Sequence, residues 1–326
     1  MPGVDVVMET IPFRRILVTG ANGFVGRYLV PVIGARLAEG ACMTLATRTP
    51  RSGGGHATVL VDLADPVSVA AAVASVRPDL VIHLAAQASV GQSLGTAADT
   101  WAVNLCGSLA LARAVADIVP DCTVLQISSA EVYGLTFNHG TVRETDPLRP
   151  QSAYGRSKAA AEAMLADVLP ASARLIIARP SNHSGPGQDE RFVIPTFAAQ
   201  IARIERGALA EIHVGNLDAE RDVLDVRDVV AAYLALLLAA PALPQRNLFN
   251  IASGKTVKIG DILDRLRAMV AIGTTVTLDP ARMRPSDVPR AALDTSAIRA
   301  ATGWSPMHDL DAVLASVLAE WRSKTD

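Results

Sequence analysis

The chain has 326 residues, of which 50% are hydrophobic and 19% are charged, and its formal net charge is −2. This length and composition suit one large or two unequal globular domains with a substantial core. A nearly neutral chain has no general attraction to nucleic acid or to an anionic membrane, so neither class of partner is expected.

The chain start, the apolar runs and the cysteines all indicate a soluble cytoplasmic protein. The first residues, MPGVDVVMETIPF, lack a basic segment followed by an apolar run, so no signal peptide is expected. The longest apolar run, residues 229–240, is too short to span a bilayer. Cys42, Cys106 and Cys122 show no metal-binding spacing, nor do the six histidines. We expect buried thiols in a reducing compartment and no metal site.

From residue 14 the chain alternates short apolar strands with helical segments, after an arm (residues 1–12) that is expected to be unstructured. Strands are predicted at 14–19, 42–47, 58–61, 80–84, 123–128 and 174–178. Helices are predicted at 24–38, 66–76, 96–118 and 152–169. Continuous Val/Ile/Leu/Ala strands in this alternation are typical of α/β proteins with a doubly wound parallel sheet covered on both faces.

The pattern becomes less regular after residue 179. A Gly/Pro-rich stretch at 184–188 is followed by a β/α unit at 223–240 and a strand at 248–251. A further helix, a Pro-rich stretch at 280–289 and two terminal helices complete the chain. We therefore predict a Rossmann-type domain of residues 14–178 plus 224–251. Residues 179–223 plus 252–326 are predicted to form a second, smaller α/β lobe that binds substrate.

The first strand runs into a glycine-rich turn, TGANGFVG at residues 19–26. Gly20 permits a tight turn, Gly23 lets the backbone approach a pyrophosphate, and Gly26 allows close packing of helix and strand. The amino end of the helix then faces the anion. At the first βα junction of a doubly wound pattern, this predicts dinucleotide binding over a merely structural turn.

The end of the second strand favours NADP(H), with NAD(H) as the alternative cofactor. An acidic residue that would bind a ribose 2′-hydroxyl is missing there, and the chain instead reads TRTPR at 47–51. Hydroxyl groups and Arg48 would accept a 2′-phosphate that a carboxylate would repel. The next strand ends in Asp62-Leu63, where an adenine amine could be capped, and the fourth in HLAAQ at 83–87, whose small residues leave room for a ribose and nicotinamide.

Tyr154 and Lys158 lie four residues apart at the start of a predicted helix, so they share a face. The chain contains four lysines, and Lys158 is the first of them. A nearby ammonium group can lower the pKa of a phenol toward working pH. The alternative is an aromatic side chain packed beside a solvent-reaching lysine. The fifth strand ends in SSAEVYG at 128–134, whose hydroxyls could polarise a carbonyl beside this pair.

TGANGFVG, HLAAQASV, SSAEVYG and YGRSK together resemble the extended short-chain dehydrogenase/reductase family of nucleotide-sugar enzymes, over nearly the whole chain from residue 14. The strings RPSNHSGPGQ (179–188), FAAQIARIE (197–205), VGNLDAERDVLDVRDVV (214–230), RPSDVP (284–289) and TGWSP (302–306) are similar to the family's GDP-4-keto-6-deoxymannose reductases. These make GDP-D-rhamnose and are relatives of the GDP-mannose 4,6-dehydratases. The resemblance implies NADP(H)-dependent reduction of a GDP-linked 4-keto-6-deoxyhexose.

By this resemblance, Tyr154 gives a proton to the 4-keto oxygen, Lys158 binds the nicotinamide ribose and lowers the pKa of Tyr154, and Ser129 hydrogen-bonds the same oxygen. The expected cofactor-binding residues, besides Tyr154 and Lys158, are Gly20, Asn22, Gly23, Phe24, Val25, Arg48, Asp62, Leu63, Leu84, Ala85 and Ala86. The expected substrate-binding residues are Ser93, Ser129, Glu131, Asn182, Val193, Arg221, Arg284 and Asp287.

Two departures from the family pattern bear on the reaction. Related 4,6-dehydratases have Glu at the position of Glu131 and Asp or Ser before it, whereas this chain has Ala130. The family often has an aromatic residue at the position of Ser181. A 4,6-dehydratase or epimerase therefore stays an alternative, and a non-catalytic dinucleotide-binding sensor is a second. The resemblance also implies a homodimer, since relatives pair Ala-rich helices such as 96–118 and 152–169.

Overall fold

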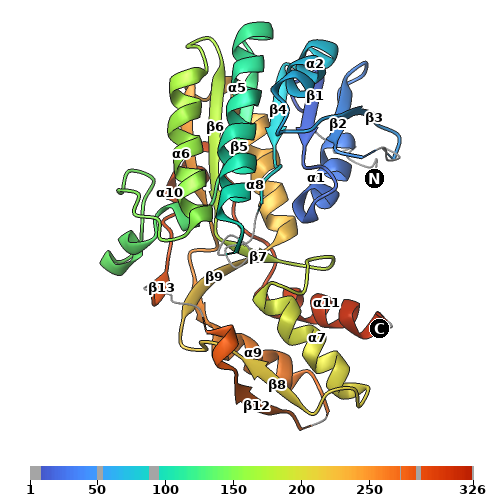
Figure 1. Cartoon of the computed structure of the whole chain (residues 1–326), viewed down its shortest axis with the longest axis vertical. Coiled ribbons are helices and arrows are strands. Elements are labelled where there is room, and N and C mark those ends of the chain that lie inside the picture. The colour runs from blue at the N-terminus through green and yellow to red at the C-terminus, as the bar shows by residue number, and fades with distance from the viewer. Residues whose placement is uncertain (1–8, 50–53, 88–94, 272, 284–287, 325–326) are drawn as a thin grey trace, which may run out of the picture.

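The computed structural model describes residues 9–49, 54–87, 95–271, 273–283 and 288–324 (Figure 1). Its main sheet has seven parallel strands in the order β10-β6-β5-β4-β1-β2-β3. These strands are β1 (Arg15–Thr19), β2 (Cys42–Thr47), β3 (Ala57–Leu60), β4 (Leu80–His83), β5 (Thr123–Ile127), β6 (Arg174–Pro180) and β10 (Arg246–Ile251). The predicted doubly wound sheet is confirmed. Its order reverses between β1 and β4, where such sheets bind ligands.

Both faces of this sheet are buried, which explains its continuous apolar strands. Side chains alternate between faces along a strand. In β1, Ile16 and Val18 enter one hydrophobic cluster and Leu17 enters the other. The first cluster is covered by α1 (Phe24–Gly34), α8 (Val226–Ala239) and α10 (Ser296–Thr302), and the second by α2 (Pro66–Val76), α5 (Gly107–Ile118) and α6 (Ala153–Val168) (Figure 1).

The long helix predicted at 96–118 is continuous but changes its winding. It comprises α4 (Ala97–Trp101), a π-helical turn η1 (Ala102–Cys106) and α5. By length and apolar composition this stretch could cross a membrane, but 44% of its apolar window is buried inside the fold. Its buried side packs against α2 and α6.

A second group of elements lies below the main sheet in Figure 1. Four strands, β7 (Asn182–Ser184), β9 (Glu220–Asp225), β11 (Thr256–Lys258) and β13 (Arg290–Ala291), form one small sheet, and β8 (Glu211–Val214) pairs with β12 (Thr275–Leu278). Helices α7 (Val193–Glu205), α9 (Ile259–Ala268) and α11 (Leu310–Ser323) pack around a core of their own. Short 3-10 turns are η2 (Ala130–Val132), η3 (Leu135–His139), η4 (Ala240–Ala242) and η5 (Pro280–Arg282).

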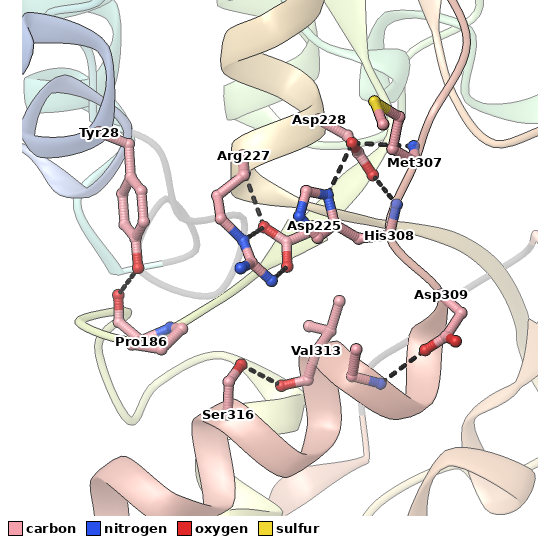
Figure 2. A network of polar contacts seen from close by, with 11 residues as sticks. Tyr28, Pro186, Asp225, Arg227, Asp228, Met307, His308, Asp309, Val313 and Ser316 are labelled. Atoms are coloured by element: carbon pink, nitrogen blue, oxygen red, sulfur yellow. Dashed lines mark hydrogen bonds and ion pairs between the residues drawn. The ribbon is translucent and has the colours of Figure 1, made fainter. Parts of the chain in front are cut away.

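The β/α unit predicted at 223–240 joins the two groups. Its strand, β9, belongs to the small sheet, whereas the helix that follows directly, α8, covers the large one. Polar contacts lie near this junction (Figure 2). Asp228 of α8 accepts hydrogen bonds of 3.0 Å from the backbone N–H groups of Met307 and His308, and the Tyr28 hydroxyl donates to the Pro186 carbonyl at 2.7 Å. The exact division into two lobes stays a prediction.

Two expectations about single residues are wrong. Ile11 of the expected arm is 1% exposed in the first cluster, and its N–H donates to the Arg36 carbonyl at 2.9 Å. The end of that arm is therefore held by its apolar side chain. Cys42 and Cys106 are exposed, and of the three thiols Cys122 alone is buried. Cys42 begins β2 at its exposed end and Cys106 lies on the outer side of η1.

Candidate active site

The glycine-rich turn brings the amino end of α1 against the end of β4. Gly20 has φ +73°, and a Cβ there would lie 2.6 Å from the Ala85 nitrogen. A Cβ on Gly26 would lie 2.4 Å from the Ala21 oxygen. Gly23, the residue before α1, has no side chain to cap the helix, so it leaves the first backbone N–H groups of α1 without a side-chain cap. This cradle, with the positive end of a helix dipole above it, fits the pyrophosphate of a dinucleotide.

A pocket of about 520 Å³ opens beside this helix end and is lined in part by Asn22, Gly23 and Phe24. The Phe24 ring stacks on His183 at 6.1 Å between centroids and 5° between planes. His183 belongs to β7, next to Asn182. The expected cofactor-binding turn and a strand of the smaller sheet are thus side by side.

Ser129, Tyr154 and Lys158 come together at the end of β5, as the sequence predicts. Gly155 allows the first turn of α6 to approach, since a Cβ there would lie 2.6 Å from the Glu131 carbonyl oxygen. Tyr154 is 8% exposed and is hydrogen-bonded by the Ser129 side chain. The Lys158 ammonium, 3% exposed, donates to the Ile127 carbonyl at 2.8 Å.

The protonation states of this group suit an acid. Burial raises the pKa of Tyr154 to about 12, although the Ser129 hydrogen bond lowers it. Burial lowers the pKa of Lys158 to about 8. Desolvation is the largest influence on this phenol, and the expected lowering of its pKa by Lys158 stays a prediction. At neutral pH the phenol holds its proton and can donate it.

Two opposite charges face each other beside the phenol. Burial lowers the pKa of the Arg221 guanidinium, and the nearby Glu131 carboxylate partly offsets this effect. The same carboxylate raises the pKa of Tyr154. Arg221 lies on β9, and its neighbour Asp222 accepts hydrogen bonds from the backbone N–H groups of residues 253–255 at 2.7–3.1 Å. Arg221 is thus held near the Tyr154 group by a strand of the small sheet.

The expected adenine end of the site is more open. Asp62 is exposed and its carboxylate accepts the Ala64 N–H at 3.0 Å, while Leu63 packs against Gly107. The Thr47 hydroxyl is buried and has no hydrogen-bond partner among the described residues, and Arg48 beside it is exposed. The exposed Arg48 guanidinium at this strand end has no acidic residue next to it in the sequence and is the group that would suit the 2′-phosphate of NADP(H).

The remaining expected residues divide into those described and those not. Leu84, Ala85 and Ala86 follow β4 near the turn, Val25 lies in the first turn of α1, and Val193 begins α7. Ser93, Arg284 and Asp287 lie outside the described residues. Within the described ranges, no group of three or more metal-ligating side chains occurs.

A buried hydrogen-bonded chain below the site was missed by the sequence reasoning. His83 bridges the Thr19 hydroxyl at 2.6 Å and the Ser108 hydroxyl at 3.0 Å. Burial, with a smaller contribution from the Lys158 charge, lowers its pKa to about 3, so His83 is neutral. Asn104, in the π-helical turn, donates to the Ser157 hydroxyl at 3.0 Å and accepts the Gln87 N–H at 2.8 Å. A buried strand ending in His and an Asn within an apolar helix were the available signals.

A buried ion pair was missed as well. Arg179, at the end of β6, binds both carboxylate oxygens of Glu162 on α6, at 3.0 and 2.5 Å. The Ser128 hydroxyl donates to the same carboxylate. Another Arg179 nitrogen donates to the Tyr133 hydroxyl at 2.7 Å. The spacing of Glu162, four residues after Lys158, was the one signal in the sequence.

Comparison with known proteins gives one family. The family model described as GDP-mannose 4,6 dehydratase matches residues 17–317. GDP-6-deoxy-D-mannose reductase of Pseudomonas aeruginosa is 34% identical over 314 residues, which cover 95% of this chain and 98% of the relative.

Solved structures agree with this match. The structure of RMD from Pseudomonas aeruginosa complexed with NADPH has a TM-score of 0.81 and 32% identity, covering 95% of this chain and 99% of the other. UDP-glucose 4-epimerase of Thermus thermophilus, complexed with NAD, has a TM-score of 0.81 and 27% identity, covering 95% and 100%.

Proposed function

This chain belongs to the GDP-mannose 4,6-dehydratase family, and we propose that it reduces the 4-keto group of GDP-4-keto-6-deoxy-D-mannose to GDP-D-rhamnose. It is an NAD(P)-dependent nucleotide-sugar oxidoreductase of the short-chain dehydrogenase type, with NADP(H) preferred and NAD(H) as the alternative. The observation that carries the choice of reduction is the buried, protonated Tyr154 beside Ser129 and Lys158.

NADPH bound along the ends of the strands would supply the hydride that reduces C4. As C4 gains the hydride, the former carbonyl oxygen takes the proton of the Tyr154 hydroxyl. Ser129, already hydrogen-bonded to that hydroxyl, orients it and stabilises charge on the oxygen. Among the described residues the Lys158 ammonium makes one hydrogen bond, to Ile127, and its other N–H groups would hold the nicotinamide ribose.

We assign the GDP diphosphate to the Arg221 side of the site, with Asn182 and Val193 nearby and with Arg284 and Asp287 as further binding residues. A guanidinium is the group that pairs best with a phosphate. Burial lowers the pKa of Arg221, which shows that its charge sits in a poorly solvated place. An anionic substrate would repay that desolvation. Residues 14–178 plus 224–251 would hold the cofactor, and 179–223 plus 252–326 the sugar nucleotide.

The alternative reactions have one observation each. Glu131 lies close enough to Tyr154 to raise its pKa, as a base for 4,6-dehydration would. Its neighbour Ala130 is buried and apolar, however, so the acid expected beside it is missing. A non-catalytic sensor would not need the Ser129–Tyr154–Lys158 group at all.

We further propose a cytoplasmic homodimer formed through the outer sides of residues 97–118 and α6. Light scattering that finds a monomer would reject this proposal.

The test is NADPH oxidation followed by absorbance at the nicotinamide band with GDP-4-keto-6-deoxymannose, beside a control with GDP-mannose alone. The reductase oxidises NADPH with the keto sugar and not with GDP-mannose. Formation of a 4-keto product from GDP-mannose without NADPH use would instead make the chain a dehydratase. NMR of the product then distinguishes GDP-D-rhamnose from the C4 epimer.

A further inference from the structure

Glu162 lies one helical turn after Lys158 on α6, so the two side chains share a face. Both residues are buried, with 6% of Glu162 and 3% of Lys158 exposed. Two buried groups of opposite charge one turn apart influence each other's ionisation, because little water screens them.

The Glu162 carboxylate is fixed from two other elements. Arg179 of β6 binds both of its oxygens, and the Ser128 hydroxyl at the end of β5 donates to one of them. Arg179 is held in turn by the Tyr133 hydroxyl at 2.7 Å, and its guanidinium lies 4.7 Å from the centre of that ring. The carboxylate therefore cannot turn away, and it ties Ser128, next to Ser129, to the helix that carries Tyr154 and Lys158.

In the described part of the chain, the other groups around Lys158 carry no negative charge that would stabilise its ammonium form. The ammonium donates to the Ile127 carbonyl of β5, and the nearby His83 of β4 is neutral. Tyr154, on the same helix, is a protonated phenol. Burial opposes the charge on Lys158, and the Glu162 carboxylate is the charged group among the described residues that favours it.

We propose that Glu162 is a positioning residue that keeps the Lys158 ammonium charged for the reaction. This rests on the proposed role of Lys158 in binding the cofactor ribose. Without the carboxylate, Lys158 would lose its proton at a lower pH. The ribose would then lose a charged donor, and the phenol would lose the nearby positive charge that supports it as its proton leaves.

Because the chain has only four lysines, the charge on Lys158 can be measured directly. NMR of protein labelled with ¹³C at the lysine Cε gives four signals, and Lys158 is identified as the one absent from Lys158→Met. We expect it to titrate near pH 8 in the unliganded protein. In Glu162→Gln its midpoint should fall by about 1 pH unit. The pH at which kcat/KM falls on the basic side of its pH profile should decrease by the same amount. No substrate is needed for the NMR measurement, so its failure is distinct from failure of the proposed function.

Two variants separate this role from a merely structural one. Glu162→Gln leaves Arg179 buried without its counter-ion and is expected to lower stability. The double variant Glu162→Gln/Arg179→Gln should regain stability while the Lys158 midpoint stays low. Glu144→Gln removes the carboxylate that accepts the Asn250 N–H at the far end of the network and should leave the midpoint unchanged. An unchanged midpoint in Glu162→Gln would overturn the proposal.

Discussion

Replacing Lys158 by Met should abolish turnover yet make the unliganded protein more stable at neutral pH. Burial lowers the pKa of Lys158 from 10.5 to about 8, which is about 2.5 units. Each unit corresponds to about 1.4 kcal/mol, so the buried ammonium costs about 3 kcal/mol at pH 7. The variant also loses the hydrogen bond to Ile127, which reduces this gain in stability by about 1 kcal/mol. The net gain is about 2 kcal/mol, or roughly 4 °C in Tm.

The pH dependence gives this prediction its sign. Between pH 8 and 10.5 the unfolded chain still holds the lysine proton that the folded protein has released, so wild-type stability rises with pH through that range. Below pH 8 the penalty is present in full. The stability difference between Lys158→Met and wild type should therefore be largest at pH 7 and shrink toward pH 10.5.

Urea denaturation at pH 7 and pH 10 measures this difference, with the exposed Lys258→Met as the matched control. We expect the control to leave stability within about 0.5 kcal/mol of wild type at both values. A Lys158→Met protein that is less stable than wild type at pH 7 would refute the reasoning. So would a stability gain that does not change with pH.

Three further substitutions test other parts of the site. Tyr154→Phe should lower kcat by about 10²- to 10⁴-fold while NADPH affinity, measured by fluorescence titration, stays within a few-fold of wild type; undiminished turnover would reject the acid. Gly26→Ala should weaken NADPH binding and cost about 1–3 kcal/mol, because its Cβ meets backbone at 2.4 Å, and calorimetry would detect both. Asp222→Ala should cost about 2–3 kcal/mol in denaturation and raise KM for the sugar nucleotide, because it frees residues 253–255 beside Arg221. An unchanged KM would show that Asp222 does not support binding of the sugar nucleotide.

The large sheet was predictable because its strands are covered on both faces and therefore read as unbroken apolar runs. The small sheet was not. β7 is three residues long and consists of Asn182, His183 and Ser184, and β13 has two residues. Such strands carry no hydrophobic period, and partners distant in the sequence hold them in place. Ile11 was missed because a single apolar residue in a polar arm has no pattern either.

The site shows the same limit. The motif positions, at the end of β5 and the start of α6, indicated that Ser129, Tyr154 and Lys158 lie near one another, and the structure places them so. Their roles stay predictions. The protonation state of Tyr154 did not follow from those positions, because desolvation by the whole fold outweighs the neighbouring groups. Glu162 could not be recognised because its partners, Ser128 and Arg179, come from two different strands.

The central claim is that this site delivers a hydride from NADPH to C4 of the sugar as Tyr154 protonates the oxygen. The most direct measurement uses NADPH deuterated at the transferable position of the nicotinamide C4, with GDP-4-keto-6-deoxymannose as substrate. NMR and mass spectrometry should find one deuterium at C4 of the product for each NADPH oxidised, with none when Tyr154 is replaced by Phe. A product without deuterium, or one formed while NADPH is not consumed, would contradict the account.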